Sequence, residues 1–261
     1  MNNKTIENKV EQILITKLIT NISLSTYLTI NIKKEEILGI YIYGSRLWKI
    51  DNEKSDLDYV IIISDNSDIW KYQNSKKDQY EEKGYILNES EDIDLHILSE
   101  TKYKEMVNKA NELALSIYYQ ENPILKYNFN LELKKDKTKL HNYLVSLRKS
   151  FSTKANNSYV KSKKKLTIEK NLILSVKSMF HSLRLLDFGY HIAKYEIEKS
   201  TQNIEKNKLL FDIEEITKNY KKELKELHIL FSSNNWEEIH QLMKPKFNKK
   251  ASLFKKIAPK N

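Results

Sequence analysis

The stretch YIYGSRLWKIDNEKSDLDYVIII, residues 41–63, decides the fold of this chain. Runs of β-branched and aromatic residues at 37–44 and 57–64 are typical of short strands. The Gly44-Ser45 pair ends the first run, and Asp56 and Asp58 stand at the start of the second. Because side chains alternate along a strand, both aspartates are predicted to lie on one face. The stretch therefore predicts two buried strands with two carboxylates at one end.

Two carboxylates this close repel each other, and one of their pKa values would rise strongly unless a cation lay between them. The chain contains no cysteine, and hard oxygen ligands favour Mg²⁺ or Mn²⁺ over zinc. Asp94 lies on the polar face of the alternating run DIDLHILS, residues 92–99, and Asp92 on the same face is its alternative. If this run pairs with 57–64, the site gains a third carboxylate. Three carboxylates can hold two divalent ions.

Gly44-Ser45 follows a strand and opens a short predicted helix. Backbone N–H groups at such a position, together with a hydroxyl, can hold a phosphate. Glycine also allows the backbone to approach the anion closely. We therefore predict that Gly44, Ser45 and the adjacent Arg46 contact a phosphate group.

The charge of the chain is divided unevenly along its 261 residues. Residues 1–130 contain 16 Lys and Arg against 21 Asp and Glu, whereas residues 131–261 contain 29 against 14. The halves thus have net charges of −5 and +15. This asymmetry predicts a polyanionic partner for the second half, and a solvated Lys-rich surface is the alternative.

Apolar residues at helical spacing predict helices at 5–22, 69–82 and 101–119. After Pro123 the strand signals almost vanish, and helical patterns appear near 137–150, 158–187, 205–231 and 235–243. The sequence predicts an α+β fold in which a small mixed sheet with flanking helices, residues 1–125, precedes a helical domain, residues 126–245. Residues 246–261 are predicted to form a flexible basic tail. No apolar run is long enough to span a membrane, and no signal peptide is apparent, so we expect a cytoplasmic protein without a membrane partner.

Three polar residues share one face of a predicted helix at 158–187. Lys177, His181 and Arg184 have the spacing i, i+4, i+7, and we predict that they meet phosphate groups. The apolar neighbours of this stripe favour the alternative that it is only the wet side of a packed helix. Weaker candidates for phosphate or nucleic-acid contacts are Arg148, Lys154 and Lys161.

The Gly44-Ser45 pair, the Asp56-Leu57-Asp58-Tyr59 run and the later Ile93-Asp94-Leu95 together resemble the signature of the DNA polymerase beta nucleotidyltransferase superfamily. YGSRLW and KSDLDYVIII are similar to the predicted nucleotidyltransferases of phages, large viruses and bacteria. The segments LRKSFSTKANNSYVKSKKKL and SVKSMFHSLRLLDFGY resemble their helical motifs, so the likeness covers residues 37–190. The chain departs from the pattern at Lys49-Ile50, where such relatives often have a glycine.

The resemblance implies a palm-like sheet and the transfer of a nucleoside monophosphate from an NTP to a hydroxyl, with release of pyrophosphate. It implies that Asp56 and Asp58 bind both metal ions, Mg²⁺ or Mn²⁺. Asp94 would bind the catalytic ion and help to deprotonate the acceptor. Gly44 and Ser45 would hold the terminal phosphates, which suits a chemistry of positioning and charge neutralisation.

The sequence leaves three functions open. The first is transfer to the end of a nucleic acid such as RNA, which the basic second half favours. The second is the same chemistry on a small-molecule or protein acceptor, which the absence of a recognisable RNA-binding module favours. The third is a non-catalytic nucleotide-binding or antitoxin-like module, which the presence of all three carboxylates disfavours.

Overall fold

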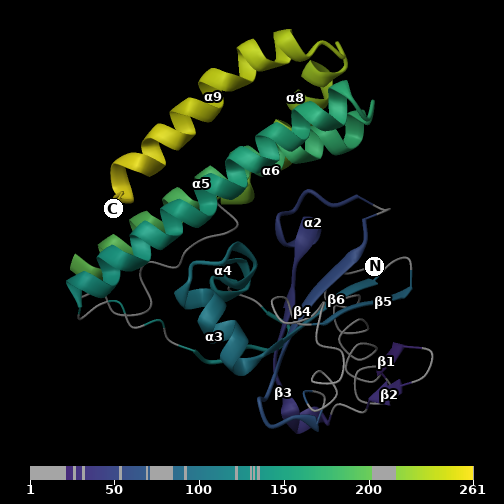
Figure 1. Cartoon of the computed structure of the whole chain (residues 1–261), viewed down its shortest axis with the longest axis vertical. Helices are drawn as coiled ribbons and strands as arrows, with labels where there is room; N and C mark the ends of the chain where they lie inside the picture. The colour runs from purple at the N-terminus through teal and green to yellow at the C-terminus, as the bar shows by residue number, and fades with distance from the viewer. Residues whose placement is uncertain are drawn as a thin grey trace. The chain divides into compact units, whose positions relative to one another are not determined.

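The computed structural model confirms the α+β fold class, with a small mixed sheet and flanking helices followed by long helices (Figure 1). It describes residues 22–25, 28–30, 33–52, 55–68, 70, 85–90, 93–120, 123–129, 131, 133, 136–201 and 216–260. The helices predicted at 5–22 and 69–82 and the alternative ligand Asp92 lie outside these residues. Among the described residues, no helix is both long and apolar enough to cross a membrane.

Contacts divide the chain into two compact units. The first comprises residues 1–106 and 116–129, and the second comprises residues 107–115 and 130–261. The segment 107–115 thus groups with the long helices, although the sequence places it in the first domain. Its grouping has a physical reason, because Glu112 in this segment forms a buried ion pair with Arg184 of the second unit.

The sheet of the first unit has the strand order β3-β4-β6-β5. Strand β4 (Leu57–Ile63) pairs antiparallel with β3 (Ile37–Ile42) and parallel with β6 (Ile93–Ser99), and β5 (Tyr85–Ser90) pairs antiparallel with β6. Residues Val60 to Ile63 of β4 are fully buried, as expected for a central strand. The three strands predicted from apolar runs are therefore present, and β4 and β6 are neighbours.

Three further strands were not predicted. β5 completes the sheet, and β1 (Ile22–Ser25) pairs with β2 (Leu28–Ile30) in a separate two-stranded sheet. The sequences of these strands, ISLS, LTI and YILNES, are short and contain several polar residues. ISLS and LTI alternate, but over only four and three residues, and YILNES does not alternate, so none of them gives a clear strand signal.

The helix predicted over 101–119 is interrupted. The structure has α3 (Glu100–Asn108) and α4 (Glu112–Tyr118), separated by Ala110 in the left-handed region with φ of 53°. The side chain of Asn111 accepts hydrogen bonds from the backbone N–H groups of Leu113 (3.0 Å) and Ala114 (3.4 Å), which caps the second helix.

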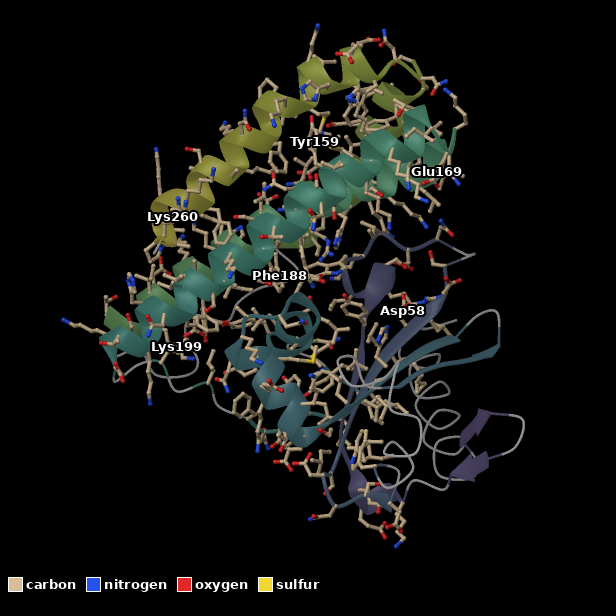
Figure 2. The ribbon with its side chains drawn as sticks, in the orientation of Figure 1. Asp58, Tyr159, Glu169, Phe188, Lys199 and Lys260 are labelled. Carbon is tan, nitrogen blue, oxygen red and sulfur yellow. The ribbon has the colours of Figure 1, made fainter. Side chains whose placement is uncertain are left out.

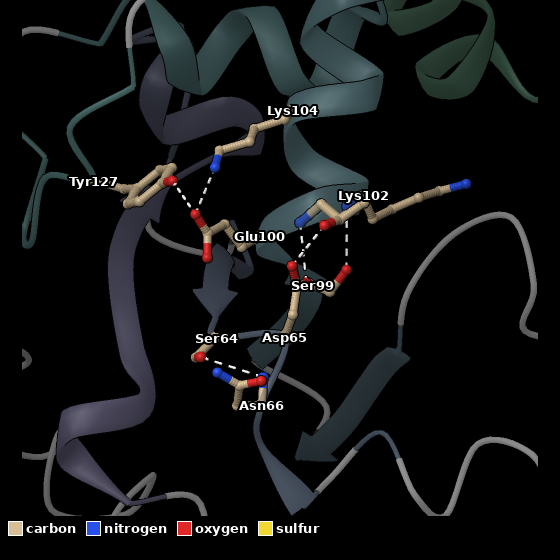
Figure 3. Close-up of polar contacts among 9 residues, drawn as sticks. Ser64, Asp65, Asn66, Ser99, Glu100, Lys102, Lys104 and Tyr127 are labelled. Atoms are coloured by element: carbon tan, nitrogen blue, oxygen red, sulfur yellow. Dashed lines mark hydrogen bonds and ion pairs between the residues drawn. The ribbon is translucent and has the colours of Figure 1, made fainter.

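Polar side chains fix the start of α3 (Figure 3). The carboxylate of Asp65 accepts from the backbone N–H of Thr101 at 3.0 Å and from its hydroxyl at 2.5 Å. Glu100 accepts from the Tyr127 hydroxyl and from Lys104, both at 2.5 Å. These contacts tie Tyr127 and Asp65, which follows β4 by two residues, to the same helix.

Within its described residues, the second unit has four long helices: α5 (Lys137–Thr167), α6 (Leu172–Thr201), α8 (Tyr220–Phe231) and α9 (Trp236–Ile257). The break predicted after residue 150 is absent, because the buried side chains of Phe151, Ala155 and Tyr159 continue one apolar stripe along α5. The turn lies instead at 168–171, and α5 and α6 run side by side as a hairpin (Figure 1).

The predicted flexible tail at 246–261 is wrong for most of its length, because α9 continues through Pro245 to Ile257. Phe247 and Phe254, seven residues apart, are both buried. Gly189 on α6 makes room for this packing: a Cβ there would lie 2.8 Å from Cζ of Phe254. The packing of these rings keeps the helix in place despite the hydrogen bond that proline cannot form.

Candidate active site

The Gly-Ser turn is built directly against Asp58. The backbone N–H of Tyr43, at the end of β3, donates to the carbonyl of Asp58 at 2.8 Å. Gly44 then adopts a φ of +64°, and a Cβ at this position would lie 1.8 Å from Oδ2 of Asp58. The Asp58 carboxylate therefore occupies the space that any other side chain at position 44 would need. Only glycine satisfies both the backbone conformation and this contact.

The three predicted carboxylate residues lie close together along the chain and the sheet. Asp58 is half-buried in β4, whereas Asp56 is exposed and precedes the strand by one residue. In the parallel ladder between β4 and β6, Asp58 is the register partner of Asp94. The sheet thus places residues 58 and 94 side by side, as the predicted pairing of the two strands requires.

The loop between the turn and β4 is held by Arg46. Its guanidinium donates to the carbonyl of Ser55 at 3.2 Å and lies 3.9 Å from the carboxylate of Asp51. Burial raises the pKa of Tyr59. The nearby positive charge of Arg46 lowers this pKa by a smaller amount, so the pKa is raised overall. Arg46 therefore links both ends of the loop immediately beside the predicted site.

Lys49 stands where the resembling family often has a glycine, and its φ is 53°, in the left-handed region. The backbone N–H of Lys49 donates to the carbonyl of Arg46 at 3.1 Å, and that of Ile50 donates to Ser45 at 3.1 Å. These bonds close the short helix α2 (Gly44–Leu47). The loop thus keeps the backbone conformation that suits glycine, at the cost of strain on a lysine.

The donors of this site fit a divalent cation such as Mg²⁺. Carboxylate oxygens are the ligands that Mg²⁺ prefers, and the Asp58 carboxylate is held in place by the Gly44 backbone. Among the side chains that the structure describes, no group of three acidic or histidine residues gathers closely enough to form a metal site. The side chain of Asp94 is not among them, so its contribution is defined by its register position alone.

In the second unit, the polar stripe of α6 divides into an exposed and a buried part. Lys177 is exposed, whereas Arg184 is 5% exposed and pairs with Glu112, with 3.1 Å between Nη2 and Oε1. The same guanidinium lies 2.7 Å from Nδ1 of His181. Lys154 of α5 lies 3.8 Å from the other oxygen of Glu112. The structure thus brings His181 and Arg184 together around Glu112 and leaves Lys177 on the surface.

The protonation of this cluster follows from its burial. Burial, and next the charge of Arg184, lower the pKa of His181 to about 4, so the imidazole is neutral at pH 7. Burial alone would raise the pKa of Glu112, but Arg184, His181 and Lys154 outweigh it and lower that pKa overall. A neutral His181 whose Nδ1 accepts from Arg184 has its proton on Nε2.

The weaker phosphate candidates occupy different settings on α5. Arg148 donates from Nη1 to the carbonyl of Ala258 at 3.2 Å and so holds the end of α9. Lys154 pairs with Glu112, as described above, and Lys161 is exposed. Of the three, Lys161 alone is exposed.

Sequence reasoning missed Glu112. It is a single acidic residue in the run NELALSIYY, where nothing in the spacing distinguishes it from a solvent-exposed glutamate. The structure shows it buried, with two cationic partners and a histidine around it. The only signal in the sequence is its place at the start of an apolar helical run, and this signal does not identify a partner.

Comparisons with known proteins found little. No protein-family model matches the chain, and no curated protein matches it. Among solved structures, the chain is similar to the crystal structure of a nucleotidyltransferase-like protein from Exiguobacterium sibiricum 255-15, with 14% identity over 81% of this chain and 75% of that one. The TM-score of this match is 0.23.

Proposed function

We propose that the chain is a metal-dependent nucleotidyltransferase that transfers a nucleoside monophosphate from an NTP to a hydroxyl acceptor. One observation supports this proposal most: Asp58 is fixed between the Gly44 turn on one side and its register partner Asp94 on the other. A glycine turn that closely contacts a carboxylate brings the place for a phosphate next to the place for a cation. A triphosphate with a bound metal ion could occupy both places, with a phosphate at the turn and the cation at the carboxylate.

The residues of the first unit have distinct roles in this proposal. Asp56, Asp58 and Asp94 would hold Mg²⁺ or Mn²⁺, two ions in all, which when bound would neutralise charge on the phosphates and on the attacking oxygen. The Gly44 backbone and Ser45 would orient the terminal phosphates. The acceptor oxygen forms a bond to the α-phosphorus, its proton passes to Asp94, and the bond to the leaving pyrophosphate breaks.

We propose a nucleic-acid end, RNA in the first instance, as the acceptor. The supporting observation is the net charge of +15 on residues 131–261. A small-molecule or protein acceptor is the second candidate, because the sequence contains no recognisable RNA-binding module. In either case Lys177, exposed on α6, is the member of the predicted stripe most open to a phosphate.

The test is transfer of label from each α-labelled NTP in the presence of Mg²⁺ or Mn²⁺, over a panel of RNA, DNA, protein and small hydroxyl acceptors. Asp58→Asn is the decisive variant, because asparagine fills the same space beside Gly44 but lacks the negative charge. We expect it to abolish transfer while the circular dichroism and melting temperature stay close to wild type.

Glu105→Gln is the matched control. It removes one exposed carboxylate from α3 of the same unit and should leave transfer unchanged. Full activity of Asp58→Asn would disprove the metal assignment. If wild-type protein binds NTP in equilibrium dialysis but labels no acceptor, the non-catalytic nucleotide-binding alternative is favoured over transfer.

A further inference from the structure

The outer side of α9 is strongly basic. The sequence from Ile239 to Asn261 contains seven lysines and no Asp or Glu. Six of these lysines are exposed, and we call them the α9 lysine face: Lys244, Lys246, Lys249, Lys255, Lys256 and Lys260. Nitrogen-tipped side chains extend outward along this helix, with Lys260 at its end (Figure 2).

The face stands on a fixed helix and not on a loose tail. Phe247 and Phe254 bury their rings in the second unit, and Arg148 donates to the carbonyl of Ala258 just after the last turn. The pair Lys250 and Asp187 adds an ion pair between α9 and α6. Because the backbone is held, the lysines lose little conformational freedom of the main chain when they bind a ligand.

Neighbouring carboxylates do not neutralise this face. Within the described part of the chain, no carboxylate lies within 4.0 Å of the ammonium groups of Lys246, Lys249 and Lys256. The lysines of α8 differ, because Lys221, Lys222 and Lys225 alternate with acidic residues in the run YKKELKE. Glu223 of α8 interacts electrostatically with Lys246 and with the neighbouring Lys250, so the α9 lysine face is compensated only in part and keeps a net positive charge.

The spacing places several of these lysines in one line. Leu242, Lys246, Lys249, Leu253 and Lys256 follow each other at intervals of four and three residues, which all fall on one side of a helix. Lys260 lies beyond the end of the helix at Ile257. Each interval advances about 5 Å along the axis. A row of cations at such spacing suits a polymer with a negative charge on every unit, since successive lysines can meet successive charges.

The burial of the apolar side of α9 favours a nucleic acid over a membrane as the partner of the α9 lysine face. A helix that lies on a membrane turns a continuous apolar face toward the lipid. In α9 that face is turned inward, because Trp236, Met243, Phe247 and Phe254 are buried. Only Leu242 and Leu253, 51% and 44% exposed, stand on the outer side. The charge is therefore accompanied by two separate leucines and by no continuous apolar face that could enter a bilayer.

We propose that the α9 lysine face binds the sugar-phosphate backbone of a nucleic acid without reading its sequence. Lysine ammonium groups are point charges that contact phosphates, and they lack the planar fork with which arginine recognises guanine. Contacts of this kind position a strand but do not specify its bases. The inference does not depend on nucleotidyl transfer. If both proposals hold, the face is the part of the chain that captures the acceptor.

The test uses the full chain, without nucleotide or metal, and a fluorescent single-stranded RNA of about twenty nucleotides, long enough to cover the helix. Anisotropy titrations over a series of salt concentrations compare wild type with K246Q/K249Q/K256Q. For single strands, each lost phosphate contact changes the slope of log K against log salt by about 0.7, so the triple variant should lower its magnitude by about 2. Near 0.1 M salt this corresponds to a loss of affinity of about 100-fold.

K221Q/K222Q/K225Q is the matched control, because it removes the same charge from exposed positions of α8 in the same unit. We expect it to stay within about threefold of wild type, since only long-range attraction is lost. An equal loss in the control would overturn the proposal by showing that net charge alone matters. Wild-type protein that binds anionic phospholipid vesicles but not RNA would overturn it in favour of a membrane.

Discussion

Replacing Gly44 with alanine tests the contact on which the candidate site depends. A Cβ at this position would lie 1.8 Å from Oδ2 and 2.5 Å from Cγ of Asp58. The left-handed conformation costs an L-residue about 1–2 kcal/mol, and overpacking costs about 1–3 kcal/mol. The smaller entropy of the unfolded alanine variant offsets about 0.4–1 kcal/mol. We therefore expect Gly44→Ala to lower the free energy of unfolding by about 2–4 kcal/mol.

A double-mutant cycle separates the two costs. Asp58→Ala removes Oδ2 and Cγ and leaves only its Cβ, which would lie 3.0 Å from the new methyl group. In this background Gly44→Ala should cost about 1 kcal/mol, the strain of the backbone alone. The coupling free energy between the two positions should then be about 1–3 kcal/mol.

The assay is urea unfolding followed by tryptophan fluorescence. In a Trp236→Phe background the remaining tryptophans, Trp48 and Trp70, both report on the first unit. Gly39→Ala is the matched control, because its Cβ would lie 2.7 Å from the ring of Tyr41 without backbone strain. Removal of the Asp58 side chain should not relieve that cost. If Asp58→Ala fails to reduce the cost of Gly44→Ala, the carboxylate does not occupy the space beside the glycine.

Four further outcomes follow from the structure. Lys49→Gly should raise the free energy of unfolding by about 0.5–1 kcal/mol, because it relieves the left-handed φ, and an unchanged urea midpoint would contradict this. Glu112→Gln should cost about 3–5 kcal/mol by leaving Arg184 buried without its anionic partner, as read from the urea midpoint of the second unit. Because the pKa of His181 is lowered to about 4, its contribution to stability is complete above about pH 6.5 and is lost as the pH falls toward 4, about 3 kcal/mol in all. His181→Gln should lack this dependence of the free energy of unfolding on pH. Phe254→Ala should cost about 3–5 kcal/mol and expose the amides of the last two turns of α9 to hydrogen exchange, whereas protection unchanged from wild type would show that its packing does not hold the helix.

Long apolar runs made the central strands predictable. β4 is buried from Val60 to Ile63, so its sequence is almost continuously apolar, and the alternation of β6 is equally plain. β5 has neither pattern, and the break between α3 and α4 depends on Ala110, a residue type that favours helix and gives no warning of a positive φ. Local propensity cannot show where tertiary contacts impose such a conformation.

The predicted tail is a second case in which the local sequence misleads, because here a helix was predicted to be a flexible segment. Its lysines and Pro259 indicate a loose end when they are read locally. However, Phe247 and Phe254 lie seven residues apart and are both buried, and Gly189 on another helix makes space for the second ring. The sequence shows Gly189 and Phe254 but does not show that they lie close together in the fold. The proximity of Asp58 and Asp94 was predictable, because it follows once β4 and β6 are neighbours. The proximity of Glu112 and Arg184 depends on how two helices pack, which the sequence pattern does not show.

The way in which Asp58 is held explains why the loop before it can vary. Its backbone carbonyl is fixed by Tyr43, its carboxylate rests against Gly44, and its register with Asp94 is set by the ladder between β4 and β6. None of these constraints involves Lys49 or the other loop residues up to Ser55. A lysine in place of glycine therefore strains the loop without moving the carboxylate, because the sheet and the turn determine its position. We accordingly expect Lys49→Gly to change stability and not the position of Asp58.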